Sequence, residues 1–250
     1  MKRRLIGWLM AAVAGLAIGA GGVAAQGVSL PPGQAAIEAA IHDYILKHPE
    51  VIIQSLQQYQ DRRKQVDAAR SRDRIQANRE LLFNDATSPV AGNPEGDVTV
   101  VEFFDYKCPY CKRVLKTLQQ AMKEDPGIRM VFKEFPILGP GSVIAARAAL
   151  ASRNQYPEKY AEFHDALMTS RQKLTESYVL DVATDLGFDR ERLRADMYAT
   201  EISAVLDRNR ALAEDIGIRG TPGFVIGDKL VPGALDLQTL KRLIARARSG

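Results

Sequence analysis

The sequence predicts an α/β domain that carries a helical insertion and follows a helical arm. The first observation is a strand–helix–strand pattern, in which β-favouring apolar runs at 98–104 and 128–135 enclose helical spacing over 109–124. A unit of this length implies two parallel strands joined by a right-handed crossover. The second observation is helical spacing throughout residues 142–216, followed by a β-hairpin predicted at 224–231.

The junction between the first strand and its helix carries the tetrapeptide Cys108-Pro109-Tyr110-Cys111. Unpaired backbone N–H groups and the helix dipole favour an anion there, and thiolate is the nucleophilic form of cysteine. Cys108 comes first and is expected to be the more exposed, attacking thiol. Cys111 is close enough to close a disulfide with it and to resolve a mixed disulfide. Pro109 suits the first helical turn because it has no N–H to leave unpaired.

Other roles for these two cysteines have less support in the sequence. A zinc site needs about four ligands, and the chain offers only these thiols and three scattered histidines. A purely structural bridge across so short a loop would restrain little of the unfolded chain. We therefore expect no metal and no cofactor beyond the Cys108–Cys111 disulfide. Two alternatives stay open: a copper(I)-sequestering metal-tolerance protein that uses the same dithiol, and a structural protein with a vestigial redox fold.

Two further features accompany the dithiol. Thr221-Pro222 leads from a loop into the short strand Phe224-Val225-Ile226, and an X-Pro bond in that setting is a candidate for a cis peptide. Glu102 lies six residues before Cys108 in an apolar run. If it faces the core, burial should raise its pKa; the other interpretation is that it faces solvent.

Together these motifs resemble the DsbA-like branch of the thioredoxin superfamily, over about residues 85–250. The resemblance implies a thioredoxin fold and a thiol–disulfide oxidoreductase or isomerase with catalytic Cys108, Cys111, Pro222 and Glu102. It implies that Glu102 assists proton transfer at Cys111. Thr221-Pro222 would pair with the extended backbone of a client, Tyr110 would tune the redox potential, and Pro109 would help to line the client site.

The resemblance also implies partners, namely client proteins and a membrane redox partner, either DsbB-like or DsbD/ScsB-like. The direction of exchange stays open, since the body resembles oxidases, whereas the arm and the Thr before Pro222 resemble isomerases. The balance slightly favours isomerase or reductase capability.

Residues 26–83 are predicted to be a helical oligomerisation arm that precedes a domain at 84–250. Apolar residues repeat along 34–82 at spacings of three, four and seven, so this stripe must be buried against the same subunit or another copy. Of these two possibilities, the sequence favours burial against another copy of the chain, that is, self-association. The segment Ile41 to Ile52 resembles the arms of ScsC-like and Com1-like secreted relatives, which form homo-oligomers.

Residues 1–25 read as a secretory signal peptide. Lys2, Arg3 and Arg4 precede an apolar run, and small residues near Ala25 favour cleavage there over a retained membrane anchor. Removal would lower the formal net charge from +4 to about +1, so the charge gives no support for nucleic-acid binding. A periplasmic or secreted location suits a redox-active dithiol.

Overall fold

The computed structural model describes residues 33–249. The chain divides into two compact units, Met1–Gln58 and Tyr59–Gly250. The signal peptide predicted for residues 1–25 lies outside the described residues. No helix among those that are described is long and apolar enough to cross a membrane.

The first unit consists, where described, of helix α1 (Gln34–Lys47) and the beginning of α2 (Pro49–Ala77). None of the α1 residues is buried. Large apolar side chains are exposed along the unit, at Ile37, Ile41, Tyr44, Leu46, Val51, Ile52, Ile53 and Leu56. Four of these residues, Ile37, Ile41, Ile52 and Leu56, belong to the apolar stripe predicted from the sequence.

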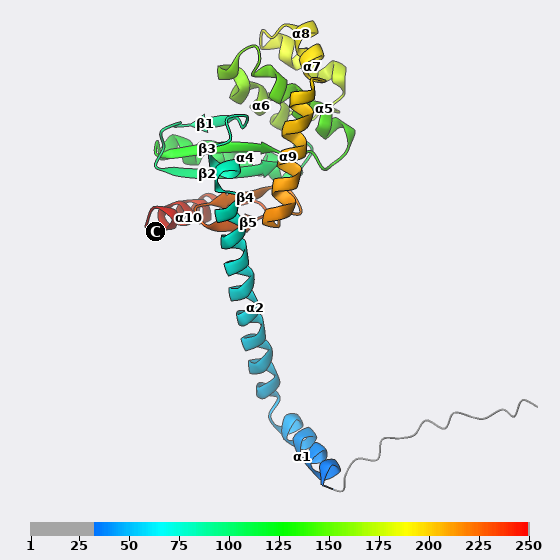
Figure 1. Ribbon diagram of the computed structural model, residues 1–250, viewed down its shortest axis with the longest axis vertical. Helices are drawn as coiled ribbons and strands as arrows, with labels where there is room; N and C mark the ends of the chain where they lie inside the picture. Colours follow the sequence, from blue (N-terminus) through cyan, green and yellow to red (C-terminus); the bar gives the residue numbers. More distant parts are fainter. Residues whose placement is uncertain (1–32, 250) are drawn as a thin grey trace, which may run out of the picture. The chain divides into compact units, whose positions relative to one another are not determined.

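The second unit is built on a five-stranded sheet with strand order β1-β3-β2-β4-β5 (Figure 1). Strand β2 (Val98–Phe104) pairs in parallel with β3 (Ile128–Glu134), as predicted, and α4 (Pro109–Glu124) connects them. Strand β4 (Gly223–Ile226) runs antiparallel to β2, and β5 (Lys229–Pro232) completes the predicted hairpin. The three inner strands, β3, β2 and β4, are almost wholly buried, which explains their nearly continuous apolar runs.

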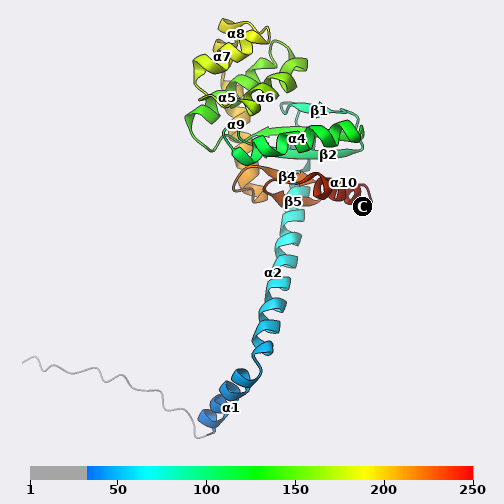
Figure 2. The ribbon, with the colours of Figure 1, turned by 180° about the vertical axis from the view of Figure 1, so that it is seen from behind.

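Helices cover both faces of this sheet. Helix α4 and the C-terminal helix α10 (Leu237–Ser249) pack together on one face, as Figure 2 shows. The other face is covered by α3 (Arg79–Phe83), the end of α2 and the second half of α9 (Thr200–Ile216). Apolar spacing places the buried α4 residues on one stripe, comprising Cys111, Val114, Leu115, Leu118 and Ala121.

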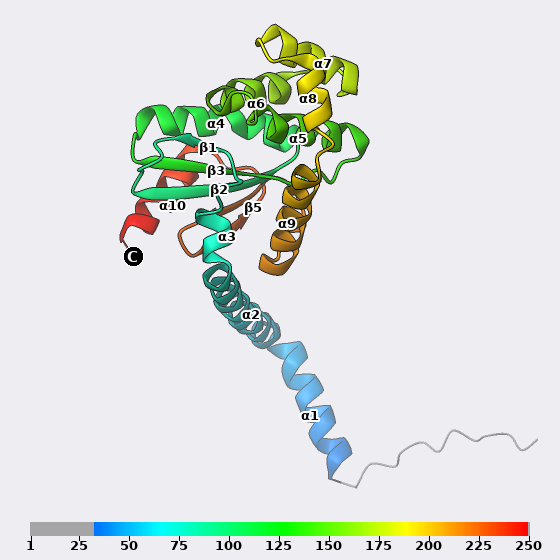
Figure 3. The same ribbon diagram turned by 45° about the horizontal axis from the view of Figure 1, so that its top comes forward.

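The predicted helical insertion consists of α5 to α9. Helices α5 (Pro140–Ser152), α6 (Tyr160–Thr169), α7 (Glu176–Asp185) and α8 (Arg190–Asp196) pack against one another (Figure 3), and a short 3-10 turn, Pro157–Lys159, precedes α6. Helix α9 returns the chain to the sheet and ends at Gly217, whose φ of 89° is the left-handed conformation that favours glycine.

The structure adds three details to the segment before β2. The arm helix ends at Ala77, where the Asn78 side chain donates to the Arg74 carbonyl and to Asp215. Residues Ile75, Leu82 and Phe83, which the sequence analysis assigns to the arm, are buried in the core of the second unit. The connector also contributes an unexpected edge strand, β1 (Val90–Gly92), antiparallel to β3.

Candidate functional site

The loop between β2 and α4 is held by a buried carboxylate. One Asp105 oxygen accepts the backbone N–H of Lys107 at 2.7 Å, and the other accepts those of Ile137 and Leu138 at 2.8 and 2.9 Å. The Asp105 carbonyl accepts the N–H of Cys108 at 3.0 Å. These bonds fix Cys108 at the position just before helix α4, with Pro109 as the first helical residue.

Both cysteines are free thiols in this structure. Cys108 is 3% exposed and Cys111 is fully buried, so the predicted order of exposure holds although both are secluded. The Cys108 thiol donates to the Thr221 carbonyl at 3.2 Å. Burial raises the pKa of the Cys111 thiol, and the nearby Glu102 and Cys108 act in the same direction. Cys111 is thus held as a protonated thiol behind Cys108.

The Thr221–Pro222 peptide bond is cis, as the sequence predicts. Pro222 is buried, and its carbonyl accepts the Gly233 N–H at 2.8 Å. Thr221 and Pro222 border a cavity of about 280 Å³ that the β4–β5 hairpin closes on one side. The structure therefore brings the Thr-Pro step against Cys108, from a position 113 residues further along the chain.

Glu102 faces the core and not solvent. It is 1% exposed, lies in the centre of β2 between Phe132 of β3 and Phe224 of β4, and its Oε1 atom has no hydrogen-bond partner among the described residues. Burial raises the pKa of its carboxyl from 4.5 to about 8. A carboxyl with this pKa, close to the Cys111 thiol, can hold or release a proton near neutral pH.

Replacement of Glu102 by glutamine is expected to change the pH dependence of stability. The folded, reduced protein holds the Glu102 proton more tightly than the unfolded chain, so the free energy of unfolding falls as pH rises from 4.5 to about 8. Over that pH window the free energy of unfolding of the wild type should fall by a few kcal/mol more than that of Glu102→Gln. The difference is on the order of 1.4 kcal/mol for each unit by which the pKa is raised. Urea unfolding of the reduced proteins at several pH values measures this difference. Glu95→Gln, at an exposed acid, is the control; parallel curves for wild type and Glu102→Gln would contradict the prediction.

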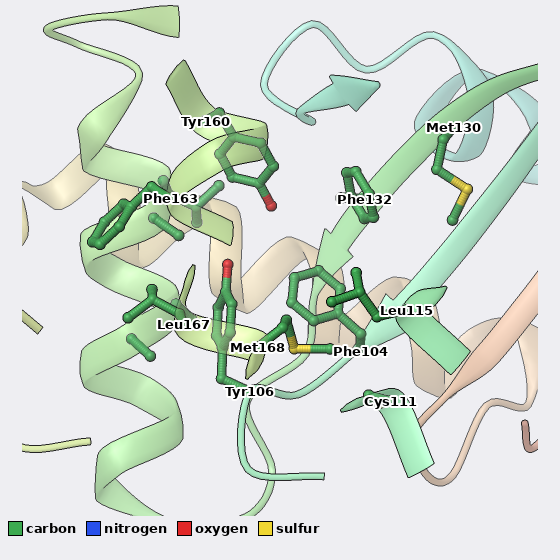
Figure 4. Close-up of a cluster of buried hydrophobic side chains, with 14 of the residues drawn as sticks. Phe104, Tyr106, Cys111, Leu115, Met130, Phe132, Tyr160, Phe163, Leu167 and Met168 are labelled. Carbon is green, nitrogen blue, oxygen red and sulfur yellow. The ribbon is translucent and has the colours of Figure 1, made fainter. Parts of the chain in front are cut away.

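A second buried acid, Glu134, lies at the end of β3 beside the same loop. Its Oε1 atom accepts hydrogen bonds from the Tyr106 and Tyr160 hydroxyls at 3.1 and 3.0 Å, and Figure 4 shows the two hydroxyl groups pointing toward one another. Tyr106 also bonds to His164 Nδ1 at 3.2 Å. Burial raises the pKa of Glu134 well above its usual range and lowers the pKa of His164 to about 3, so a neutral network supports the loop.

The two remaining predicted site residues, Pro109 and Tyr110, are exposed at the beginning of α4. Tyr110 is 53% exposed, and the Arg113 guanidinium lies 4.9 Å from the centre of its ring. Both residues are accessible beside Cys108, whereas Glu102 lies behind Cys111. Within residues 33–249, no group of three or more His, Cys, Asp and Glu side chains is arranged to hold a metal ion.

Sequence reasoning missed Asp105 and Glu134. Asp105 lies between Phe104 and Tyr106, which is the same signal that singled out Glu102, whereas Glu134 directly follows Lys133 and its local sequence gives no such signal. An acid in an apolar stretch needs a partner when it is buried. Applied throughout the chain, this criterion would have found Asp105 beside Glu102, but not Glu134.

A parallel strand pair with a helical crossover, a dithiol at the helix start and a cis-proline facing it define a thioredoxin-fold protein with a helical insertion. The model of the DSBA-like thioredoxin domain matches residues 99–245, and the chain belongs to this family. The model of the Copper resistance protein ScsC N-terminal domain matches residues 34–65, within the arm.

Solved structures agree with this assignment. A thioredoxin-like oxidoreductase from Silicibacter pomeroyi is 51% identical, with a TM-score of 0.67, and the match covers 69% of this chain and 99% of that one. ScsC of Proteus mirabilis in a transitional conformation is 26% identical with a TM-score of 0.66, covering 88% of this chain and 99% of its own. The ScsC match is long enough to include much of the arm.

Curated relatives fall into two kinds. Disulfide bond formation protein D of Bacillus subtilis is 26% identical over 172 residues, which are 65% of this chain and 78% of that protein. The Na(+)/H(+) antiporter NhaA 1 of Salinispora arenicola is 29% identical over 171 residues, which are 64% of this chain but 25% of the antiporter. The chain therefore spans about a quarter of the length of such antiporter relatives.

Proposed function

We propose that this protein is a periplasmic thiol–disulfide oxidoreductase that exchanges disulfides with client proteins through Cys108 and Cys111. The observation that carries the proposal is the contact between the Cys108 thiol and the Thr221 carbonyl, beside the cis-Pro222. A client chain that approaches Cys108 in extended form meets backbone groups of this loop. The printed descriptions of the relatives, an oxidoreductase and a disulfide bond formation protein, support the same activity.

The proposed exchange conserves atoms and electrons. The Cys108 thiolate attacks one sulfur of a client disulfide, forms the Cys108–client bond and releases the other client sulfur as a thiolate that takes a proton. Cys111 then loses its proton and attacks Cys108, which frees the second client thiol and leaves a Cys108–Cys111 disulfide. The client is reduced by two electrons and the dithiol is oxidised; the reverse sequence oxidises a client dithiol.

Glu102 has a defined role in this series of exchange steps. The Cys111 thiol must lose a proton before it can attack, yet burial raises its pKa and works against this step. Glu102 has a carboxyl pKa of about 8 and influences Cys111 electrostatically. We assign it the transfer of this proton: ionised Glu102 takes the proton from Cys111 when a client disulfide is reduced, and protonated Glu102 returns it to Cys111 when a client dithiol is oxidised.

The arm indicates which direction of disulfide exchange we propose. Exposed apolar side chains between Ile37 and Leu56 and the match to the ScsC N-terminal domain support assembly of several chains through this segment. Several dithiols in one assembly can hold a misfolded client while its disulfides are broken and re-formed, which favours isomerase or reductase action. A membrane reductant of the DsbD/ScsB type would then keep the dithiol reduced, whereas a DsbB-like partner would serve an oxidase.

Glutamate substitutions in the arm test this direction. We expect Ile41→Glu/Ile52→Glu to be monomeric by light scattering, because each change places a charge on an exposed apolar surface that must be buried on assembly. The wild type should reactivate a scrambled multi-disulfide substrate at least about tenfold faster than the variant, as expected for an effective-concentration advantage. Oxidation of a reduced substrate should be equal in both.

Gln57→Glu/Gln60→Glu, which also adds two negative charges to exposed positions of α2, is the matched control and should behave as the wild type. A wild type that oxidises the reduced substrate but never reshuffles the scrambled one would make the protein an oxidase. Point substitutions are preferable to deletion of residues 26–83, since Ile75, Leu82 and Phe83 belong to the core of the second unit.

Copper(I) sequestration is the second candidate function. Two adjacent thiols suit this soft ion, and the arm matches a domain described from a copper resistance protein. In the same exchange assay, this function predicts that one equivalent of copper(I) blocks disulfide exchange and is held against a competing chelator. Exchange that is unaffected by copper(I) would argue for the oxidoreductase alone.

A further inference from the structure

The dithiol loop borders a cavity of about 820 Å³ on the side of the helical insertion. Tyr106, Lys107 and Lys112 line it from the side of the dithiol. The opposite wall comes from the start of α5, from the loop 170–175, which includes Ser170, and from Glu176, the first residue of α7. Apolar groups of Pro140, Ile144 and Leu174 line part of this cavity.

The charged side chains that line this cavity are mostly cationic. Four cationic side chains line it, those of Lys107, Lys112, Arg171 and Lys173. The two lysines beside the dithiol donate only to carbonyl oxygens, Lys107 to Leu138 at 2.7 Å and Lys112 to Ser170. Within residues 33–249, no carboxylate oxygen lies within 4.0 Å of any of these four cations.

The single acid that lines the cavity is already neutralised. One Glu176 oxygen is paired with Arg194 Nε at 2.9 Å, and the other accepts the Tyr198 hydroxyl. Glu176 therefore offers little charge to the four cations. Two lysines that donate to no carboxylate, next to an apolar wall, make the cavity a place where an anion gains favourable interactions.

The position of the cavity relative to the thiols identifies the anion. Lys107 directly precedes Cys108 and Lys112 directly follows Cys111, so two cations of the cavity are sequence neighbours of the thiols, although neither thiol lines the cavity itself. On its other side Cys108 contacts Thr221, which borders the smaller cavity of about 280 Å³. A client chain joined to Cys108 therefore has the cationic cavity on one side and the Thr221-Pro222 loop on the other.

We propose that the cavity lined by Lys107, Lys112, Arg171 and Lys173 is a client subsite that takes an acidic side chain close to the client's reacting cysteine. This inference rests on the proposed function and specifies its preferred client. The apolar wall at Ile144 and Leu174 accommodates the methylene groups of a glutamate, and the four cations surround its carboxylate. Because exposed charges are screened by salt, the preference should weaken as ionic strength rises.

The test compares two peptides that carry one cysteine pair as a disulfide and differ only in having glutamate or glutamine beside the reacting cysteine. The wild type in its reduced form should reduce the glutamate peptide about tenfold faster at low salt, the lower end of electrostatic rate enhancements. Arg171→Gln/Lys173→Gln, which changes the pocket without touching the residues next to the thiols, should bring this ratio below about threefold.

The matched control is Lys116→Gln/Lys123→Gln, which removes two exposed lysines from α4 that do not line the cavity. This control should retain the tenfold ratio. Equal rates for the two peptides in the wild type would overturn the proposal, as would an equal loss of preference in both double variants, because net charge and not the cavity would then be responsible.

Binding of unreactive peptides separates this inference from the proposed function. With serine in place of both cysteines, the glutamate peptide should bind the wild type more tightly than the glutamine peptide, and this difference should vanish in Arg171→Gln/Lys173→Gln. Absence of any exchange with selective binding retained would remove the proposed function and keep the subsite. Equal binding of the two peptides, together with cavity-dependent binding to vesicles that contain phosphatidylglycerol, would overturn the subsite and assign the cations to a membrane surface.

Discussion

Replacement of Cys108 by serine is expected to reduce the rate of disulfide exchange at least about 1000-fold, as for other enzymes that lose their nucleophile. A serine hydroxyl does not attack a disulfide at neutral pH, and the remaining thiol cannot substitute for it. Cys111 is fully buried, and burial raises its thiol pKa, so it presents neither an accessible nor an ionised sulfur to a client. Reduction of a small disulfide substrate, followed by absorbance, measures the rate.

The complementary variant, Cys111→Ser, should accumulate a mixed disulfide between Cys108 and the client, because the resolving thiol is missing. Mass spectrometry under non-reducing conditions would show the adduct, and a phosphine reductant would remove it. Retained exchange in Cys108→Ser would contradict the assignment. The alternative in which the fold is structural and its dithiol is vestigial predicts instead that the wild type and Cys108→Ser are alike in showing no exchange.

Replacement of Phe104 by alanine is expected to lower the free energy of unfolding by about 3–5 kcal/mol. Phe104 is fully buried at the end of β2, close to Tyr106 and Phe132 (Figure 4). Its ring meets those of Tyr106, Phe132 and His164 edge-to-face at centroid distances of 5.1, 5.8 and 4.8 Å. Alanine leaves a cavity among these rings. Against a typical stability of about 5–15 kcal/mol, this is a large fraction.

Urea unfolding of the oxidised protein measures this loss. Phe104→Leu keeps most of the volume and should cost less than about 1.5 kcal/mol. Leu138→Ala, at a residue that is 41% exposed, is the surface control. A loss below about 1 kcal/mol in Phe104→Ala would mean that the neighbouring rings collapse into the space, contrary to the packing described here.

The variants Cys108→Ser and Phe104→Ala distinguish a loss of catalysis from a loss of structural stability. Cys108→Ser removes the reacting sulfur and leaves the core intact, whereas Phe104→Ala weakens the core on which the loop 105–107 rests. Tyr106 links this loop to the core, since its ring packs on Phe104 and its hydroxyl donates a hydrogen bond to Glu134. Loss of activity in Phe104→Ala should therefore follow the loss of folded protein and be restored by conditions that stabilise the fold.

Local patterns were sufficient for most elements of the second unit. The ranges predicted for β2, α4 and the insertion agree with the structure to within a few residues, because side-chain periodicity and turn residues act over short distances. The dithiol at the start of α4 and the cis bond at Thr221–Pro222 were predicted for the same reason. The edge strand β1 was missed because three residues are too few to show a period.

Features that depend on distant parts of the chain were decided only in three dimensions. The sequence left open whether Glu102 faces the core, since the answer depends on which helices cover that side of β2. The contact of Cys108 with Thr221 and the hydrogen bond of Tyr160 to Glu134 join residues 113 and 26 positions apart. The cationic cavity likewise combines Lys107 and Lys112 with a loop of the insertion. Strand order and helix packing create these proximities, and they are properties of the whole fold that no local pattern encodes.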